Sequence, residues 1–383
     1  MSVEGLHRPS WAEVSRAAIV ANARAMKAVV GATSLCAVVK ADGYGHGATL
    51  AAAAALDGGA DTLGVATIDE GAELRRAGFD VPIIVLAEVV PTSIPLALEN
   101  SLTLTVGSTA GANAVVACAA HVRGRHLVHV KVDTGMHRMG VAPEELDAVI
   151  DTLGASAHVD VEGLFTHLPV ADGASEDDRA FTASQIRHFE GLVASLRNRG
   201  VLPRVLHCAN SAGTLGYPES HFSMVRVGLS LYGYLPAPWC AEALTSRGLA
   251  LEPAMTIRTR VVARRRLAAG ERPSYGRARP LERDATVVTV PIGYADGFPR
   301  ALFEGGAQVL AGGRRRPLAG NVTMDQLIID VGDDDVALGD EVVLLGRQGD
   351  EVITADEWAE RDGTIAWEIL TRIGPRVPRI AVR

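Results

Sequence analysis

Eight short apolar runs recur between residues 36 and 227, and segments with the periodicity of helices separate most of them. The runs lie at 36–39, 63–66, 83–87, 102–106, 127–132, 161–165, 205–209 and 224–227. This alternation is typical of buried parallel strands joined by helices. Eight strands over roughly 230 residues fit a (β/α)8 barrel. We favour the barrel over an open doubly wound sheet because no run resembles a dinucleotide-binding fingerprint.

The pattern changes near residue 250. Beyond it, strand-like runs follow one another with turns and few helices, at 256–263, 286–291, 308–311, 327–331 and 341–345. This succession is typical of an antiparallel sheet. We therefore predict an α/β plus β protein, with a (β/α)8 TIM barrel in residues 1–250 and a mainly antiparallel β domain in residues 251–383. The short strand-like run at 11–15 can join the C-terminal sheet instead of the barrel.

Composition narrows the class of partner. The formal net charge is −8 with both signs interspersed, and aromatic residues make up 4% of the chain. Neither feature suits a nucleic acid as the main partner. We find no secretory signal, no apolar stretch long enough to span a membrane, and four distant cysteines without a CxxC pair. We therefore expect a cytoplasmic protein that acts on a small molecule, with reduced thiols, no membrane partner and no metal site.

Lys40 ends the first of the eight runs and is followed by glycines at 43, 45 and 47. A strand delivers such a lysine to a fixed place, and the glycines allow a close approach of the backbone. The lysine could form a Schiff base with a carbonyl substrate or with pyridoxal phosphate. It could equally be a structural lysine that extends into solvent. The segment alone leaves both interpretations open.

Other polar residues follow the later runs, and chemistry in a barrel belongs at the carboxyl ends of its strands. Each has a structural explanation when taken singly, but together they predict a cationic mouth that binds an anion. The set comprises Lys40, Lys131, Arg138, His167, Ser211 and Arg226. Loops after the last two strands are the usual phosphate site of this fold, where Ser211 offers a hydroxyl and Gly228 and Leu229 offer N–H groups. A phosphate there and a lysine across the barrel suggest pyridoxal phosphate.

The motifs resemble those of bacterial alanine racemases, in order and across nearly the whole chain. The matching segments are 39–47, 131–140, 163–167, 207–212, 225–229, 274–277, 293–297 and 321–326. The resemblance implies a pyridoxal-phosphate enzyme that interconverts L-alanine and D-alanine by a two-base mechanism and supplies D-alanine for peptidoglycan. It also implies a homodimer with shared active sites.

The resemblance also assigns roles by position. Lys40 becomes the Schiff-base lysine and one proton carrier, and Tyr275 becomes the second carrier. Arg138 and the backbone of Met324 would hold the substrate carboxylate, and Arg226 would face the pyridine nitrogen. The remaining cofactor-binding positions are Tyr44, Arg138, His167, Asn210, Ser211, Gly228 and Leu229. Supporting positions are Lys131, which is carbamylated in some members, and Tyr294, Arg300 and Asp325.

Some positions depart from the family pattern. The chain has Asp42 and Gly43 where Asn-Ala is common, Thr323 where cysteine is common, and Pro375 in place of a tyrosine that contacts the phosphate. Three alternatives stand beside the racemase. They are a pyridoxal-phosphate carrier without the β domain, a decarboxylase of basic amino acids, and a racemase of broader range. The segments around Tyr275 and Met324 argue against the carrier, and the chain length and lack of a cysteine-bearing dimer motif argue against the decarboxylase.

Overall fold

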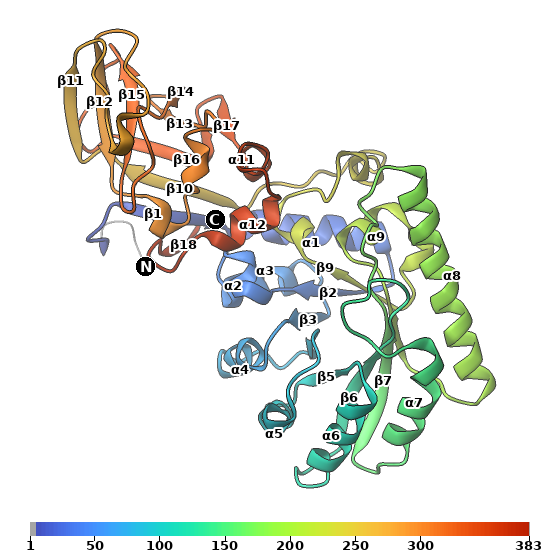
Figure 1. Cartoon of the computed structure of the whole chain (residues 1–383). Helices are drawn as coiled ribbons and strands as arrows, with labels where there is room; N and C mark the ends of the chain where they lie inside the picture. Colours follow the sequence, from blue (N-terminus) through green and yellow to red (C-terminus); the bar gives the residue numbers. More distant parts are fainter. Residues whose placement is uncertain (1–4, 383) are drawn as a thin grey trace. The chain divides into compact units, whose positions relative to one another are not determined.

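The computed structural model describes residues 5–382, which form two compact units (Figure 1). The first unit contains the described residues up to Ala17, Tyr44–Gly47, and the chain from Pro253 onward. The second contains Ala18–Gly43 and Ala48–Glu252. The division therefore differs from a simple cut at residue 250, because the N-terminal segment belongs with the C-terminal sheet.

The second unit is built on an eight-stranded parallel sheet, which confirms the predicted barrel. Its spatial order is β8-β7-β6-β5-β4-β3-β2-β9. The backbone N–H of Arg226 donates to the carbonyl of Ala209 over 3.0 Å and so links β9 to the end of β8. The strands are β2 (Ser34–Val38), β3 (Thr62–Val65), β4 (Ile83–Val85), β5 (Thr103–Val106), β6 (His126–Lys131), β7 (Val159–Phe165), β8 (Val205–His207) and β9 (Met224–Val227).

Helices precede, connect and follow these strands (Figure 1). Two begin with a capping box, in which Thr67 pairs with Glu70 and Ser175 pairs with Asp178. Each box satisfies backbone donors that the first helical turn leaves unpaired. The helices are α1 (Arg16–Val30), α3 (Ala48–Asp57), α4 (Ile68–Arg76), α5 (Ile94–Glu99), α6 (Thr109–Ala119), α7 (Leu146–Gly154), α8 (Glu176–Asn198), α9 (Ser211–Gly216) and α10 (Glu242–Thr245).

The first unit contains two sheets of mainly antiparallel strands. The larger has the order β14-β13-β16-β10-β1-β18, with β17 paired to β16, and the smaller has the order β11-β12-β15. Strand β1 (Ser10–Ser15) pairs antiparallel with β10 and parallel with β18. The other elements are β10 (Met255–Arg260), β11 (Ala263–Leu267), β12 (Ala285–Val290), β13 (Gln308–Ala311), β14 (Arg314–Pro317), β15 (Leu327–Gly332), β16 (Glu341–Gln348), β17 (Glu351–Ile353), α11 (Ala355–Asp362), α12 (Ala366–Arg372) and β18 (Arg379–Val382).

The arginine run at 314–316 lies in β14, which pairs antiparallel with β13. Arg315 pairs with Glu351 and Glu357, and Arg316 pairs with Asp334. These partners explain why the run forms part of a sheet.

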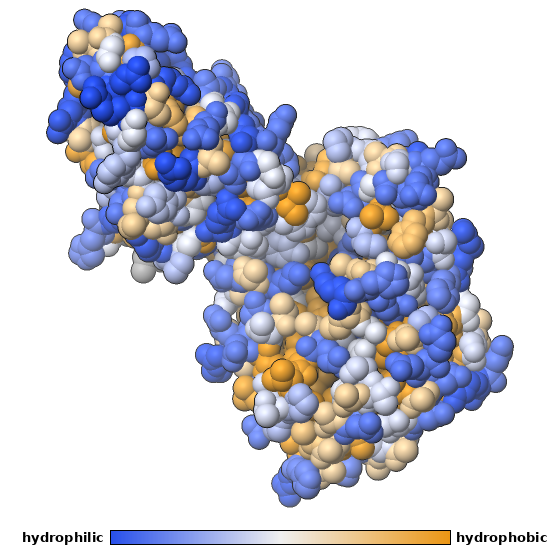
Figure 2. Space-filling model, viewed as in Figure 1, coloured by the Kyte–Doolittle hydropathy of each residue, from blue (hydrophilic) through white to orange (hydrophobic). Residues whose placement is uncertain are grey.

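No helix within residues 5–382 is long and apolar enough to cross a membrane. The visible face of the first unit is largely hydrophilic, whereas that of the barrel unit mixes hydrophilic and hydrophobic residues (Figure 2).

Candidate active site

Lys40 begins the tight segment α2 (Lys40–Tyr44), and Val39 alone separates it from the end of β2. Ala41, Asp42, Gly43 and Tyr44 all have φ between 52° and 61°, in the left-handed region. Three of these are not glycine, and such conformations cost free energy and gather at functional sites. The strain therefore marks this strand end as a place where the backbone geometry matters.

Contacts around α2 hold the strained turn in place. The carboxylate of Asp42 accepts a hydrogen bond from the N–H of Ala48 at 2.8 Å. Glu70 accepts one from the N–H of Ala41 at 2.7 Å. Two carboxylates thus satisfy one backbone donor within the left-handed turn and one at the start of α3.

The Lys40 amine lies in surroundings that disfavour its charge. Burial lowers the pKa of Lys40, the positive charge of Arg138 lowers it further, and Glu70 opposes both. A lowered pKa increases the neutral fraction of an amine, which is the form that attacks a carbonyl.

Lys131 lies at the end of β6, and only 2% of the residue is exposed. Burial, together with the positive charges of Arg138 and Arg226, lowers the pKa of Lys131 to about 8. In the loop that follows, one carboxylate oxygen of Asp133 accepts from three backbone N–H groups. This turn precedes Arg138 and shapes the loop that carries it.

Arg226 on β9 is fixed by four acceptors. Its Nη2 donates to the carbonyls of Thr166 and Cys208 and to Nδ1 of His167, over 3.0, 3.1 and 3.0 Å. Its Nη1 donates to Nδ1 of His207 over 2.8 Å. Burial lowers the pKa of Arg226 to about 10, so the guanidinium stays charged at neutral pH. The structure therefore brings Arg226 and His167 together, as the sequence predicts for one rim.

The predicted phosphate residues also meet in this unit. The hydroxyl oxygen of Ser211 accepts a hydrogen bond from the N–H of Gly228 over 3.1 Å. Asn210 caps α9 by accepting from Gly213, and its amide donates to the carbonyl of Leu168. Leu229 is buried at the start of the next short helix. The loops after β8 and β9 are thus joined through Ser211.

Tyr275, Tyr294, Arg300, Met324 and Asp325 all lie in the first unit. The phenol-bearing Tyr275 is 76% exposed, and Met324 is 52% exposed. The backbone N–H of Tyr294 donates to the carbonyl of Thr323 over 3.0 Å, which links two of the predicted segments. Arg300 is exposed on a short helix.

Asn321 joins Tyr275 to the same group of loops. Its side-chain amide donates to the Tyr275 carbonyl over 2.7 Å, and its own carbonyl accepts from the hydroxyl of Ser274 at 2.6 Å. Ser274 has a φ of 69°. Asn321 therefore holds the backbone of Tyr275, whereas the Tyr275 side chain is exposed.

Tyr44 belongs to the first unit by its contacts and is buried. Burial raises its pKa to about 12, so its phenol keeps its proton at neutral pH and can donate a hydrogen bond.

Sequence reasoning missed several residues that support the site. Glu70 contacts the α2 backbone, His207 and His129 lie behind Arg226, and Asp296 is fully buried beside Tyr294. One signal was available for His129. It lies two residues before Lys131 on the same strand, so the two side chains share a face.

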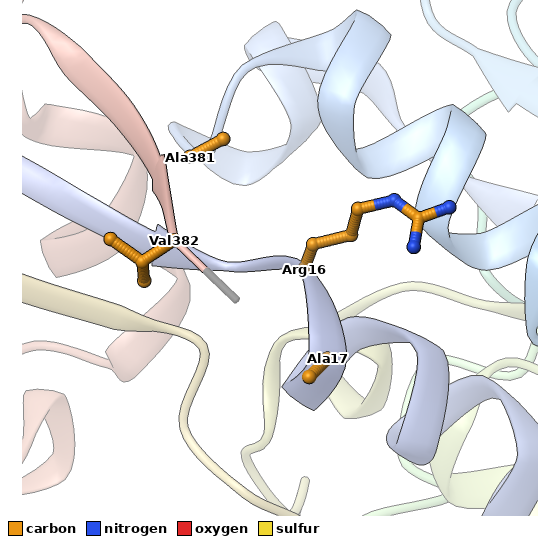
Figure 3. Close-up of a pocket in the computed structure, with 4 residues that line it drawn as sticks. All are labelled: Arg16, Ala17, Ala381 and Val382. Atoms are coloured by element: carbon orange, nitrogen blue, oxygen red, sulfur yellow. The ribbon is translucent and has the colours of Figure 1, made fainter. Parts of the chain in front are cut away.

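A pocket of about 410 Å³ lies in the first unit, lined by Arg16, Ala17, Ala381 and Val382 (Figure 3). It contains none of the predicted site residues, and we assign it no function. Among residues 5–382 no cluster of three or more histidine, cysteine or acidic side chains could hold a metal ion.

Two family models match the chain in sequence. The model for the alanine racemase N-terminal domain matches residues 14–236, and the model for the alanine racemase C-terminal domain matches residues 254–381. Alanine racemase from Symbiobacterium thermophilum is 45% identical over 385 residues, which cover 99% of this chain and 98% of that protein. Alanine racemase from Desulfovibrio desulfuricans is 40% identical, with 98% of each chain covered.

The chain also resembles solved structures of racemases. Alanine racemase from Bacillus anthracis, determined with bound L-Ala-P, has a TM-score of 0.92 and 36% identity, with 99% of this chain and 96% of that chain covered. Histidine racemase from Leuconostoc mesenteroides has a TM-score of 0.88 and 31% identity, with 98% and 99% covered. Fold and site together define the class of barrel-type amino-acid racemases. The chain belongs to the alanine racemase family.

Proposed function

We propose that this protein interconverts L-alanine and D-alanine with pyridoxal phosphate as its cofactor. The observation that carries the proposal is the group of strand-end residues in the barrel. Lys40 has a lowered pKa beside Arg138, and Arg226 is held by four acceptors. A cationic rim with one amine prepared for covalent attachment suits an anionic aldehyde cofactor.

The residues present fit that cofactor. Lys40 would hold its aldehyde carbon, Ser211 and the backbone at Gly228 and Leu229 would bind its phosphate, and Arg226 would face its ring nitrogen. When bound, pyridoxal phosphate withdraws electrons from the substrate Cα and makes its proton acidic. Arg226 donates hydrogen bonds and does not release its proton, so it leaves an acceptor nitrogen opposite it unprotonated. Pro375 has no hydroxyl, so it would donate no hydrogen bond to the phosphate from that position.

Racemisation requires that a proton leave one face of Cα and return to the other. A single base would have to move between the faces, whereas two bases on opposite faces need no movement. We assign Lys40 to one face and Tyr275 to the other. Arg138 and the Met324 backbone would hold the substrate carboxylate, which fixes the orientation of Cα between the two bases.

We propose a homodimer with shared active sites, in which Tyr275 serves the barrel of a second copy. Its 76% exposure leaves the phenol available, while Asn321 fixes its backbone. Within this proposal, the residues around Tyr294, Arg300, Met324 and Asp325 also belong to the shared site. We further propose that the enzyme acts in the cytoplasm and supplies D-alanine for peptidoglycan.

Lys131 has a distinct proposed role. With a pKa near 8, a substantial fraction of its amine is neutral at physiological pH. A neutral amine adds to carbon dioxide, forming an N–C bond and releasing one proton, and the product is a carbamate anion. That anion would pair with Arg138 and replace a repulsion by an attraction.

The test is incubation of the purified protein with L-alanine and pyridoxal phosphate in deuterated water. We expect deuterium at Cα together with loss of optical rotation. Borohydride reduction followed by peptide mass analysis should place the cofactor on Lys40, and Lys40→Arg should abolish both signals. Cofactor binding without exchange would instead indicate a carrier protein. L-Serine and L-histidine serve as comparison substrates, and equal rates on all three would indicate a broad racemase.

A further inference from the structure

A line of hydrogen bonds runs through the barrel interior from Arg226 to Glu162. Nη1 of Arg226 lies 2.8 Å from Nδ1 of His207. Nε2 of His207 lies 2.8 Å from Nδ1 of His129. Nε2 of His129 lies 3.4 Å from a carboxylate oxygen of Glu162. Arg226 and both histidines are buried, whereas the Glu162 side chain is 20% exposed. We call this line the histidine relay.

Chemistry fixes the direction of the relay. A guanidinium only donates, so Nδ1 of His207 accepts and its proton lies on Nε2. That proton is donated to Nδ1 of His129, whose own proton then lies on Nε2 and points to Glu162. The hydrogen bond from His129 lowers the pKa of Glu162, and burial lowers the pKa of both histidines. Two neutral imidazoles therefore connect a buried cation to an anion.

A bulge in β7 and a glycine beside His129 make room for the histidine relay. Val128 pairs with Val161, but His129 pairs with Gly163, so Glu162 is an extra residue on β7. Such a bulge redirects a side chain and is common beside functional sites. A Cβ at Gly163 would lie 2.6 Å from the His129 ring, so glycine is required for the imidazole to fit.

Phe165 packs against His207, which is one of the two histidines of the relay. Its ring stacks on His207 with centroids 4.5 Å apart and planes 7° apart, and the Arg226 guanidinium carbon lies 5.3 Å from its centroid. The stacking fixes the plane of the His207 imidazole, and with it the direction in which Nδ1 accepts.

We propose that Glu162 is a positioning residue for the racemisation, which acts through His129 and His207 to hold Arg226 in its orientation. The inference rests on the proposed function for the role of Arg226 toward the cofactor. Arg226 is a buried cation whose other acceptors are two carbonyls and His167. A buried charge without a counterion is costly. Glu162 polarises the two imidazoles in turn. This polarisation places partial negative charge on Nδ1 of His207, next to the guanidinium.

The strand offers a matched control in Asp160. It lies on β7 with an 18% exposed side chain, and like Glu162 it pairs with Arg204. Asp160 forms ion pairs with two arginines, Arg125 and Arg204, whereas Glu162 also binds His129. Glu162→Gln and Asp160→Asn therefore remove the same charge from the same strand, and only the first touches the relay.

The experiment combines two measurements on the full chain, with and without added pyridoxal phosphate. Nitrogen-15 NMR of labelled histidines reads the tautomers without turnover, and His129→Gln and His207→Gln assign the signals. We expect both imidazoles to be neutral with the proton on Nε2 from pH 6 to 8. We expect Glu162→Gln to shift the His129 signals and lower kcat about tenfold with KM within about twofold, as outer-shell partners typically do. Asp160→Asn should leave the spectrum and kcat unchanged within about twofold.

Two results would overturn the proposal. One is a wild-type spectrum in which His207 carries its proton on Nδ1. The other is an equal kcat for the two variants. The proposed function fails separately, when the wild-type protein exchanges no deuterium into alanine whatever tautomers the histidines adopt.

Discussion

Nη2 of Arg226 donates a hydrogen bond to Nδ1 of His167 across 3.0 Å. Because a guanidinium only donates, this contact places the His167 proton on Nε2. Burial and the charge of Arg226 hold the pKa of His167 well below its usual range, so the ring is neutral at physiological pH. One arginine thereby sets the protonation of its neighbour, and in the proposed site it would offer a permanent positive charge to the cofactor ring.

The first prediction concerns that charge. Arg226→Glu should lower racemisation by about 10²-fold or more, the typical loss when a positioned electrostatic group is removed. A carboxylate favours protonation of a nitrogen opposite it, which makes the ring a stronger electron sink and should raise the transamination of alanine to pyruvate. A coupled pyruvate assay measures the side reaction, with Arg226→Lys as the control that keeps the charge. No increase in pyruvate in Arg226→Glu would show that the proposed role is wrong.

The second prediction concerns the two bases. Tyr275→Phe should lower kcat by about 10²- to 10⁴-fold, the range for a lost general acid or base. Cofactor attachment to Lys40 should persist, because the removed hydroxyl is not part of that bond. Borohydride trapping checks attachment, and polarimetry checks the rate. Tyr294 belongs to the proposed shared site but is assigned no proton transfer, so Tyr294→Phe should lose less activity than Tyr275→Phe. An equal loss in both variants would argue against proton transfer by Tyr275.

The third prediction is a pH dependence of stability. A pKa of about 8 for Lys131 in the folded state lies below the ordinary value of 10.5. Between these values the unfolded chain binds more protons, so the free energy of unfolding rises with pH. The penalty for burying the ammonium is fully present below pH 8 and is relieved above it. We expect a rise of about 2 kcal/mol between pH 8 and 10.5 in wild type that Lys131→Met lacks.

Urea denaturation in buffer freed of carbon dioxide measures this difference. Added bicarbonate should reduce the wild-type slope, because a carbamate at Lys131 no longer titrates as an amine. Parallel slopes in wild type and Lys131→Met would contradict the assignment. A structure that shows an ammonium at Lys131 in bicarbonate would contradict the carbamate alone.

The fourth prediction concerns Asp296. Its fully buried carboxylate accepts from both terminal nitrogens of Arg8, at 2.6 and 2.5 Å, and from the N–H of Gly293. Arg376 bridges it to Asp325. Arg8 and Arg376 are partly exposed, so Asp296→Asn removes charge-assisted hydrogen bonds without leaving a buried cation, and it should destabilise the fold by about 2 kcal/mol. Asp325 is half-exposed, so Asp325→Asn should lower the free energy of unfolding by less than about 1 kcal/mol. Thermal and urea unfolding compare the two, and equal losses would refute the distinction.

Sequence patterns predicted the barrel because buried parallel strands are short apolar runs, and these remain visible along the chain. The strand-end residues followed from topology, since Lys40 and Arg226 lie directly at or near the ends of their runs. The histidine relay was not predicted. Its residues lie inside strands, and a bulge at Glu162 shifts the register in a way that alternation does not reveal.

Other features could not be predicted because the residues that form them have partners far away along the chain. Strand β1 pairs in the C-terminal sheet, which is one of the two places that the sequence left open for the run at 11–15. Its partners lie more than 240 residues away, so local propensity could not decide between the two. The run at 314–316 is highly charged, yet its arginines are neutralised by partners distant in sequence. The burial and pairing of Asp296 were not predicted for the same reason, because its partner Arg8 lies 288 residues away.

The central claim is that an amine and a phenol from two chains meet at one carbon. Subunit mixing tests it most directly. Lys40→Ala and Tyr275→Phe homodimers are each expected to be nearly inactive, whereas a mixed dimer contains one site with both groups intact. Random mixing should therefore restore about a quarter of wild-type racemisation, since half of the dimers are mixed and each has one complete site. No recovery, with mixed dimers demonstrated by mass spectrometry, would contradict the shared site.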